Sequence, residues 1–294
     1  MHKSGFVNII GNPNVGKSTL MNALVGEKLS IITSKAQTTR HRILGIVNGD
    51  DFQIVFSDTP GILKPCYKLQ ESMMNFVRGA LSDADVLLYV TDTVERDDER
   101  AAEIIDRIRQ SGVPTLVVVN KIDLTTQEAL EALVEKGRAT LPDAEIIPIS
   151  AREGFNIAGL FDRILALLPE GEPFYPKDTL TDKTLRFFAS EIIREKILRN
   201  YDKEIPYSCE IEIEEYREEP GIDRISAVIY VARNSQKGIL IGHKGEKLKK
   251  VGRQAREELE EFLRKKVFLQ LFVKVSEDWR NDQRQLRRFG YDPQ

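Results

Sequence analysis

One run near the amino terminus constrains the fold of this chain more than any other feature. Residues 11–18 read Gly-Asn-Pro-Asn-Val-Gly-Lys-Ser, which fits the pattern GxxxxGK[ST]. The run follows a strand-like stretch at Phe6–Ile10 and opens a helical pattern at Lys17–Val25, a context typical of a phosphate-binding loop. Glycines there allow backbone N–H groups to turn toward phosphate oxygens. We therefore predict phosphate contacts from Gly11, Asn12, Pro13, Asn14, Val15, Gly16, Lys17, Ser18 and Thr19.

The apolar runs that follow this loop indicate an α/β domain with a mostly parallel sheet and helices on both faces. Besides Phe6–Ile10, strand-like runs lie at Ile43–Val47, Phe52–Phe56, Val86–Val90, Thr115–Val119 and Ile146–Ile149. Helical patterns alternate with them at Lys17–Val25, Gln70–Ser82, Asp98–Gln110, Thr126–Thr140 and Ile157–Leu168. Such alternation is typical of parallel sheets. Prolines 169, 173 and 176 then read as a linker, so we expect one domain at 1–170 and a linker at 171–182.

A second motif, Asp58-Thr-Pro-Gly61, follows the strand at Phe52–Phe56. A carboxylate there can hold Mg²⁺ through water, with the Ser18 hydroxyl as a direct ligand, while Lys17 reaches the β- and γ-phosphates. The Gly61 amide can contact the γ-phosphate, so the segment senses the nucleotide state. A threonine before the second strand can complete the Mg²⁺ site. We prefer Thr39, and Thr38 stays open. The expected switch residues are Thr38, Thr39, Asp58, Thr59, Pro60, Gly61 and Ile62.

A third motif selects the base. Asn120-Lys-Ile-Asp123 follows the strand at Thr115–Val119. A carboxylate at Asp123 can accept hydrogen bonds from guanine N1–H and the 2-amino group, whereas adenine would leave it unpaired. Asn120 can brace the loop, Lys121 can lie over the ring, and the Ala151 amide of Ser150-Ala151-Arg152 can meet guanine O6. We therefore predict guanine contacts from Asn120, Lys121, Asp123, Ser150, Ala151 and Arg152.

These motifs together resemble the TrmE–Era–EngA-like group of translation-factor-related GTPases. The resemblance implies GTP hydrolysis to GDP and phosphate, with Mg²⁺. Ras-like GTPases carry a glutamine after DxxG that orients the attacking water, but this chain has Ile62. Catalysis must then depend on Mg²⁺, Lys17 and backbone amides. Some members of the group also bind K⁺ through the asparagine that matches Asn14, so K⁺ is a further expected cofactor; a purely structural role for Asn14 in the loop stays open.

Composition adds limits on the location of the protein and on its metal chemistry. The chain has two cysteines, Cys66 and Cys209, and no CxxC pair, so we expect neither a zinc site nor a disulfide framework. No apolar run approaches the ~20 residues of a membrane span, and the amino terminus lacks a signal-peptide pattern. We expect a cytoplasmic monomer.

The pattern changes after the linker. Net charge is −6 for residues 1–180 and +3 for residues 181–294, an asymmetry that suggests two domains with different partners. Helical patterns at Thr184–Asn200, Gln236–Ile241 and Glu246–Arg264 and strands at Tyr207–Tyr216, Ile225–Ala232 and Phe268–Val275 give the order α-β-β-α-α-β. Pro220-Gly221 marks the turn between the first two strands.

Gly242-His-Lys-Gly245 lies between the last two helical patterns and resembles the GxxG loop of type II KH domains, which have this element order. The resemblance implies an α+β RNA-binding domain at 183–276, in which the loop clamps the sugar-phosphate chain of single-stranded RNA. Lysines after the loop add salt-sensitive attraction. The expected RNA contacts are Ile241, Gly242, His243, Lys244, Gly245, Lys247, Lys249 and Lys250. We expect a basic tail at 277–294 that carries Arg280, Arg284, Arg287 and Arg288.

A GTPase domain followed by a type II KH domain resembles the Era family over essentially the whole chain. That resemblance implies binding to the 3′ end of 16S ribosomal RNA, with no DNA partner, and a role in assembly of the small ribosomal subunit. An alternative is a GTPase switch whose second domain docks a protein or a membrane. The basic tail also leaves open a peripheral contact at the inner face of the cell membrane.

Overall fold

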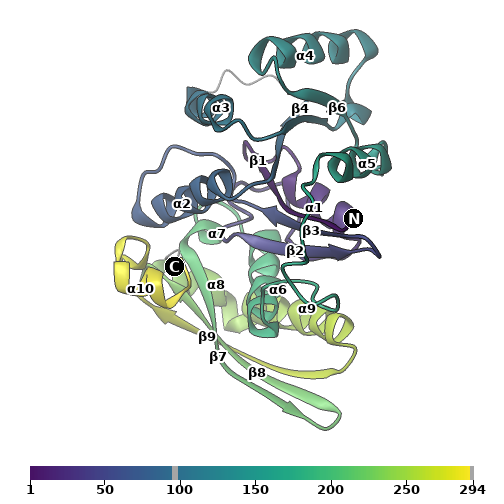
Figure 1. Cartoon of the computed structure of the whole chain (residues 1–294). Helices are drawn as coiled ribbons and strands as arrows, with labels where there is room; N and C mark the ends of the chain where they lie inside the picture. The colour runs from purple at the N-terminus through teal and green to yellow at the C-terminus, as the bar shows by residue number, and fades with distance from the viewer. Residues whose placement is uncertain (95–98, 292–294) are drawn as a thin grey trace. The chain divides into compact units, whose positions relative to one another are not determined.

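The computed structural model describes residues 1–94 and 99–291 and divides into two compact units (Figure 1). The first unit comprises Met1–Cys66 and Gln70–Asp182. The second comprises Tyr67–Leu69 and Lys183–Gln294. Among the described residues, no helix combines the length and the apolar character needed to cross a membrane.

The first unit is built on a six-stranded sheet in the order β2-β3-β1-β4-β5-β6. Its strands are β1 (Lys3–Gly11), β2 (Ile43–Asn48), β3 (Phe52–Asp58), β4 (Val86–Asp92), β5 (Thr115–Asn120) and β6 (Glu145–Pro148). Every neighbouring pair is parallel except β2–β3, which is antiparallel. The expected mostly parallel sheet is therefore confirmed, and its carboxyl edge gathers the loops that follow β1, β3, β5 and β6.

Helices cover both faces of this sheet (Figure 1). They are α1 (Lys17–Val25), α2 (Lys68–Ser82), α3 (Glu99–Ser111), α4 (Gln127–Thr140) and α5 (Ile157–Leu167), with a short 3-10 turn η1 at Ile122–Leu124. Apolar residues of α2, α3 and α4 pack on one face against Ile10, Leu87 and Val117. On the opposite face Phe161 of α5 contacts Phe52 and Phe56. The expected start of the third helix at Asp98 lies outside the described residues.

The expected linker at 171–182 has defined contacts within the first unit. The Gln53 carboxamide binds the backbone of Phe174 and Tyr175. Farther along, the Ile46 amide donates to the Leu180 carbonyl at 2.8 Å, and the Thr181 hydroxyl donates to the Leu44 carbonyl at 2.6 Å. The segment thus covers the outer edge of β2, where an exposed edge strand would leave backbone groups unpaired.

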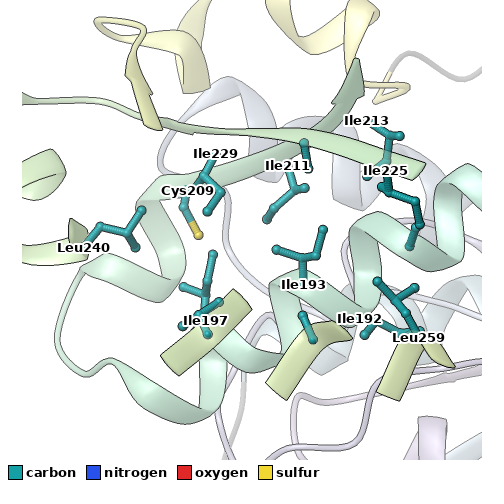
Figure 2. Packing of buried hydrophobic residues seen from close by; sticks show 14 of the residues in the cluster. Ile192, Ile193, Ile197, Cys209, Ile211, Ile213, Ile225, Ile229, Leu240 and Leu259 are labelled. Atoms are coloured by element: carbon teal, nitrogen blue, oxygen red, sulfur yellow. The ribbon is translucent and has the colours of Figure 1, made fainter. Parts of the chain in front are cut away.

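The second unit has a three-stranded sheet in the order β7-β8-β9. Strands β7 (Cys209–Glu219) and β8 (Ile222–Val231) are antiparallel, while β8 and β9 (Lys266–Val275) are parallel. The helices are α6 (Leu185–Asn200), α7 (Ile205–Ser208), α8 (Asn234–Ile241) and α9 (Glu246–Leu263), and η2 (His243–Gly245) lies before α9. Figure 2 shows the core, in which Ile193 and Ile197 of α6 pack against Ile211 and Ile229 of the sheet.

Three local features of this unit differ from the expectations. The strand expected from Tyr207 begins at Cys209, because Ile205–Ser208 forms α7 and a proline is well tolerated in the first turn of a helix. A register shift between Ile213 and Glu215 interrupts the alternation of β7. The expected tail folds into η3 (Trp279–Asn281) and α10 (Gln283–Arg288).

Buried aromatic residues hold that carboxyl-terminal segment in place. Trp279 and Tyr291 are fully buried. The Trp279 indole donates to the Ser208 carbonyl at 3.1 Å, and the Tyr291 hydroxyl bonds Glu210 at 2.5 Å. Arg288 pairs with Glu212 on β7. Of the arginines in the expected basic tail, Arg288 therefore forms an ion pair within the second unit.

Candidate functional site

The first unit contains a cleft of about 770 Å³ at the carboxyl edge of its sheet. Five segments line it: the phosphate loop, residues 31–39, Gly61 after β3, the loop after β5 and the loop after β6. Fold topology explains this gathering, because parallel strands of an α/β sheet end on one edge and ligands bind there. Of the expected site residues, the lining includes Pro13, Asn14, Gly16, Lys17, Ser18, Thr19, Thr38, Thr39, Gly61, Asn120, Lys121, Asp123, Ser150, Ala151 and Arg152.

Two glycines of the site are required by close approach. Gly16 has φ +98°, and a Cβ there would lie 2.2 Å from the Asn120 side-chain nitrogen. At Gly61 a Cβ would lie 2.8 Å from Pro13 Cα. The packing of the loops therefore leaves no room for a side chain at either position.

Lys17 is buried and lies inside the loop that it follows. Its ammonium donates to the carbonyls of Gly11 and Asn12 at 3.1 and 2.9 Å. Burial lowers the pKa of Lys17 to about 8, partly opposed by the nearby Asp58 carboxylate. Burial also raises the pKa of Asp58, and Lys17 and the hydroxyl of Ser18 oppose that effect. Both groups thus carry a desolvation cost that a bound anion or cation would relieve.

Three oxygen ligands converge beside Lys17. Ser18 Oγ lies 2.8 Å from Thr39 Oγ1 and 2.7 Å from Asp58 Oδ2, and Thr39 Oγ1 lies 3.3 Å from the same carboxylate oxygen. Asp58 Oδ1 is buried and has no hydrogen-bond partner among the described residues. Hydroxyls and a carboxylate with unused acceptor capacity fit Mg²⁺, which prefers oxygen ligands and takes few of them from protein.

The two candidate threonines of the switch have different surroundings. Thr39 points to Ser18 and Asp58 and is buried. The Thr38 hydroxyl instead donates to the Lys35 carbonyl at 2.6 Å and accepts a hydrogen bond from the Thr33 hydroxyl at 2.7 Å. Thr38 therefore closes a local turn, and the geometry favours Thr39 as the Mg²⁺ ligand.

Asn14 links the phosphate loop to residues 31–39, the segment that carries Thr38 and Thr39. Its backbone is left-handed, with φ +65°, a conformation that asparagine tolerates better than most residues. The Asn14 amide donates to the Ser34 carbonyl at 3.2 Å. This contact brings the Asn14 side chain next to the Ser34 carbonyl.

Asn120 ties together three loops around the expected base site. Its amide donates to the Val15 carbonyl, and its Oδ1 accepts from the Lys121 and Ala151 amides. The Ala151 amide, expected at guanine O6, is thus directed at Asn120 here. Ser150 Oγ donates to Asp123 Oδ1 at 2.6 Å, which orients the carboxylate and leaves Oδ2 for a ligand.

One partner in this region was missed from the sequence. Lys121 Nζ pairs with Asp92 at 2.8 Å and donates to the Asn14 carbonyl, so Asp92 at the end of β4 fixes the lysine that should cover the base. Its signal was only its position after a strand. Arg152 is exposed and pairs with Glu153, while Thr59 is buried and bonds the Ile9 carbonyl. Ile62 lies in the core beneath the switch.

The second expected site is the loop between α8 and α9. Gly242 has φ +74° and ψ 179°, and Gly245 has φ +79°. Conformations of this kind favour glycine. The loop leads directly into the amino terminus of the long helix α9, whose first amides are available to an anion. The expected contacts His243, Lys244, Lys247, Lys249 and Lys250 are all exposed.

Apolar neighbours of the loop differ in burial. Leu240 is fully buried and its carbonyl accepts the Tyr201 hydroxyl at 2.5 Å, so it belongs to the core. Ile241 is half-buried. Ile239, which was not among the expected contacts, is 44% exposed. Glu212 and Glu214 of β7 pair with Arg288 and Lys274 on one face of the sheet. Helices α8 and α9 pack on the opposite face.

Comparisons with known families agree with this two-unit arrangement. A family described as 50S ribosome-binding GTPase matches residues 6–121, and the KH domain family matches residues 204–280. The GTPase Era of Syntrophus aciditrophicus (strain SB) is 46% identical over 294 residues, covering 99% of this chain and 96% of the relative. The GTPase Era of Alkaliphilus metalliredigens (strain QYMF) is 45% identical, covering 99% of both chains.

Solved structures give the same result in three dimensions. A crystal structure of Era in complex with MgGDPNP and nucleotides 1506–1542 of 16S ribosomal RNA matches with a TM-score of 0.96 and 42% identity, covering 100% of both chains. A crystal structure of an Aquifex aeolicus Era variant bound to GDP and AlF4⁻ matches with a TM-score of 0.95 and 43% identity, covering 99% of this chain and 100% of that one.

Proposed function

The chain belongs to the Era family of GTPases, and from that premise we propose that it is a GTP-hydrolysing switch that binds the 3′ end of 16S ribosomal RNA during assembly of the small ribosomal subunit. The observation that carries the proposal is the coexistence of a complete guanine-nucleotide cleft and an exposed, lysine-flanked GxxG loop in one chain. The relatives solved with MgGDPNP and with 16S ribosomal RNA support it.

In the proposed nucleotide site, Ser18 and Thr39 hold Mg²⁺ directly and Asp58 holds it through water. When bound, Mg²⁺ would offset the negative charge of the phosphates. Lys17 leaves the carbonyls of Gly11 and Asn12 to contact phosphate, and its pKa rises because the anion stabilises the ammonium. The Gly61 amide contacts the γ-phosphate, and Asp123 with Ala151 reads the guanine edge.

Hydrolysis here has no glutamine to orient water, because the residue after Gly61 is Ile62 and it is buried in the core. Lys17, the phosphate-loop amides and the metal then supply the electrostatic stabilisation of the transition state. We also propose K⁺ as a further cation, held by Asn14 and carbonyls of 33–39. The hydrolysis rate in KCl should exceed that in NaCl at equal ionic strength, and equal rates would count against this role.

In the proposed RNA site, backbone amides at Gly242–Gly245 and the amino terminus of α9 contact about four nucleotides. Lys244, Lys247, Lys249 and Lys250 add phosphate attraction that weakens as salt increases. We propose the matching division of the chain as a GTPase domain at 1–170, a linker at 171–182, a KH domain at 183–276 and a carboxyl-terminal segment at 277–294. A monomeric state, a cytoplasmic location and a peripheral membrane contact stay predictions, to be tested by sedimentation, cell fractionation and vesicle flotation.

The decisive experiment is titration of the purified full chain with single-stranded RNA from the 3′ end of 16S ribosomal RNA. It is run with a non-hydrolysable GTP analogue and with GDP, each at two salt concentrations. We expect tighter binding in the GTP-analogue state and weaker binding at higher salt. Absence of RNA binding in both states would contradict the RNA part of the proposal and favour a protein or membrane partner for the second unit.

A further inference from the structure

The sheet of the second unit has a regular exposed pattern that the GxxG site does not use. Alternate residues of a strand lie on the same face, and in β9 the residues on the helix side pack into the core. The residues on the other face are all exposed, and Phe268 and Phe272 are 43% and 49% exposed. We call this set the β9 platform: Lys266, Phe268, Gln270, Phe272 and Lys274.

The adjacent strand supports the two rings differently. Arg224 is in register with Phe268, and its guanidinium lies 5.3 Å from the ring centroid. Val228 is in register with Phe272 and is fully buried. Phe268 therefore has a cation beside its ring, and Phe272 has a buried apolar residue as its neighbour on β8. Phe268 and Phe272 thus form an exposed aromatic pair rimmed by polar residues, a feature that can mark an interaction site.

We propose that the β9 platform is a second contact for single-stranded RNA, a proposal that rests on the RNA binding proposed above. Bases stack on aromatic rings with little dependence on sequence, and the terminal lysines can meet the phosphates on either side. Phe268 and Phe272 are four residues apart, roughly 13 Å along the strand. An RNA strand whose bases stack on both phenylalanine rings must therefore be more extended than in a duplex. The Gln270 amide would then face the edge of the base between the two rings.

Charge on this face favours RNA along β9 in particular. Lys274 pairs with Glu214 at 2.7 Å and Arg224 pairs with Glu219 at 3.1 Å. Such exposed pairs contribute little to stability, so phosphate can replace the carboxylates. The acids of β7 disfavour a polyanion along β7, whereas the platform itself contains no acid and its two lysines are held in exposed pairs, Lys266 with Glu260 at 3.7 Å and Lys274 with Glu214. RNA is thereby confined to the β9 side.

The platform and the GxxG loop lie on opposite sides of the sheet, because α8 and α9 pack on the face that β9 turns toward the core. An RNA that fills only the GxxG groove, about four nucleotides, cannot reach the platform. A longer RNA can pass around the outer edge of β9, with which no further strand of the described residues pairs. The platform should therefore contribute to the affinity for long RNA and not to that for short RNA.

The test compares an unstructured RNA of about 5 nucleotides with one of about 15 nucleotides, both titrated by fluorescence anisotropy against the full chain with a GTP analogue. For the double variant Phe268→Ala/Phe272→Ala we expect at least a roughly tenfold loss of affinity for the long RNA and no change for the short one. Phe272→Trp should retain the long-RNA affinity, whereas Phe272→Leu, which keeps apolar area but loses the ring, should not.

Phe262→Ala is the matched control, because Phe262 is 40% exposed on α9 and contacts Phe188 away from the platform. Thermal melts of each variant verify the fold. Unchanged long-RNA affinity in the double variant would overturn the proposal and leave the face to a protein partner. Failure of the unmodified chain to bind either RNA would overturn the proposed function itself, so the two failures are distinguishable.

Discussion

Asn120 illustrates how one side chain organises the nucleotide site. It contacts Val15 in the phosphate loop, Lys121 in its own loop and Ala151 after β6. These three contacts use both polar atoms of a single buried amide, and the close approach to Gly16 leaves no room for a Cβ there. The sequence predicted a bracing role for Asn120, but the link to the phosphate loop requires the folded sheet.

At the same scale, Asp123→Asn should change the base preference. The carboxylate is positioned by Ser150 Oγ at 2.6 Å, and an asparagine can keep that bond while replacing the acceptor with an amide donor. Affinity for GDP should fall roughly a hundredfold or more, and affinity for xanthosine diphosphate should rise, because xanthine presents a carbonyl at position 2. Competition binding measures both constants. An unchanged preference for guanine would exclude Asp123 as the base-reading residue.

Lys17 gives a prediction about pH. Its pKa in the nucleotide-free protein is about 8, below that of an exposed lysine, and bound phosphate should raise it. The unfolded chain therefore holds more protons than the nucleotide-free fold between pH 8 and 10.5, so stability gained from this group increases as pH rises through that window. The nucleotide affinity should instead decrease as pH rises, because Lys17 must take up a proton when the nucleotide binds.

Calorimetric titration with GDP at pH 8, in buffers of different ionisation enthalpy, measures that proton directly. We expect uptake of about half a proton per nucleotide at this pH, and an affinity that decreases as pH rises further. Lys17→Arg is a useful comparison, because arginine stays charged and any remaining uptake must come from other groups. Uptake near zero in the unmodified chain would mean that Lys17 is already fully protonated.

At the scale of elements, the switch segment shows where sequence reasoning left two choices. Thr38 and Thr39 are adjacent, and both are polar residues in a polar stretch, so spacing alone cannot separate them. The turn formed by Thr33, Lys35 and Thr38 does so, because it uses the Thr38 hydroxyl and directs Thr39 toward Ser18. A hydrogen bond between residues five apart depends on a loop conformation that no periodicity encodes.

The two threonines should therefore differ when each is replaced by alanine. Thr39→Ala removes a hydroxyl that faces Ser18 and Asp58, and should raise the Mg²⁺ concentration needed for half-maximal GTP hydrolysis by roughly tenfold or more. Thr38→Ala loosens only the turn and should change that concentration less than threefold or so. A Mg²⁺ titration of both variants decides the assignment, and a larger effect of Thr38→Ala would reverse it.

Elements whose cause is local were the most predictable. The helix at Lys17–Val25 and the start of β2 at Ile43 were expected as found, because apolar periodicity and the flanking glycines act within a few residues. Helix α7, the bulge at Ile213–Glu215 and helix α10 were not expected. The last depends on Trp279 and Tyr291 finding the Ser208 carbonyl and Glu210, contacts across about 70 or 80 residues of sequence, so tertiary packing outweighs the basic composition.

At the scale of the whole molecule, nucleotide and RNA chemistry are assigned to different units, so each should be removable without the other. In the nucleotide unit the site is a cleft with buried Lys17 and Asp58, whose electrostatic interactions are stronger and less sensitive to salt than those of exposed charges. In the second unit the lysines around Gly242–Gly245 are exposed, which makes their attraction weaker and salt-sensitive.

The GxxG loop provides the sharpest test of that separation. Gly242→Asp with Gly245→Asp places two carboxylates where RNA phosphates should lie, and RNA affinity should fall by more than about tenfold while GTP affinity stays unchanged. Gly242 has ψ 179° as well as positive φ, so a side chain there also strains the backbone. The double variant alone would therefore not distinguish charge repulsion from local distortion of the backbone.

Gly245 makes the distinction possible. Its φ of +79° and ψ of 9° form a left-handed turn, a conformation that aspartate and asparagine both tolerate. A Cβ there would meet no atom of the described residues within 4 Å. Gly245→Asp and Gly245→Asn therefore differ mainly in one charge. If phosphate contacts the loop, Gly245→Asp should weaken RNA binding clearly more than Gly245→Asn. The difference in RNA affinity between the two variants should become smaller as the salt concentration rises. Equal effects of the two variants at low salt would place the phosphate chain away from Gly245.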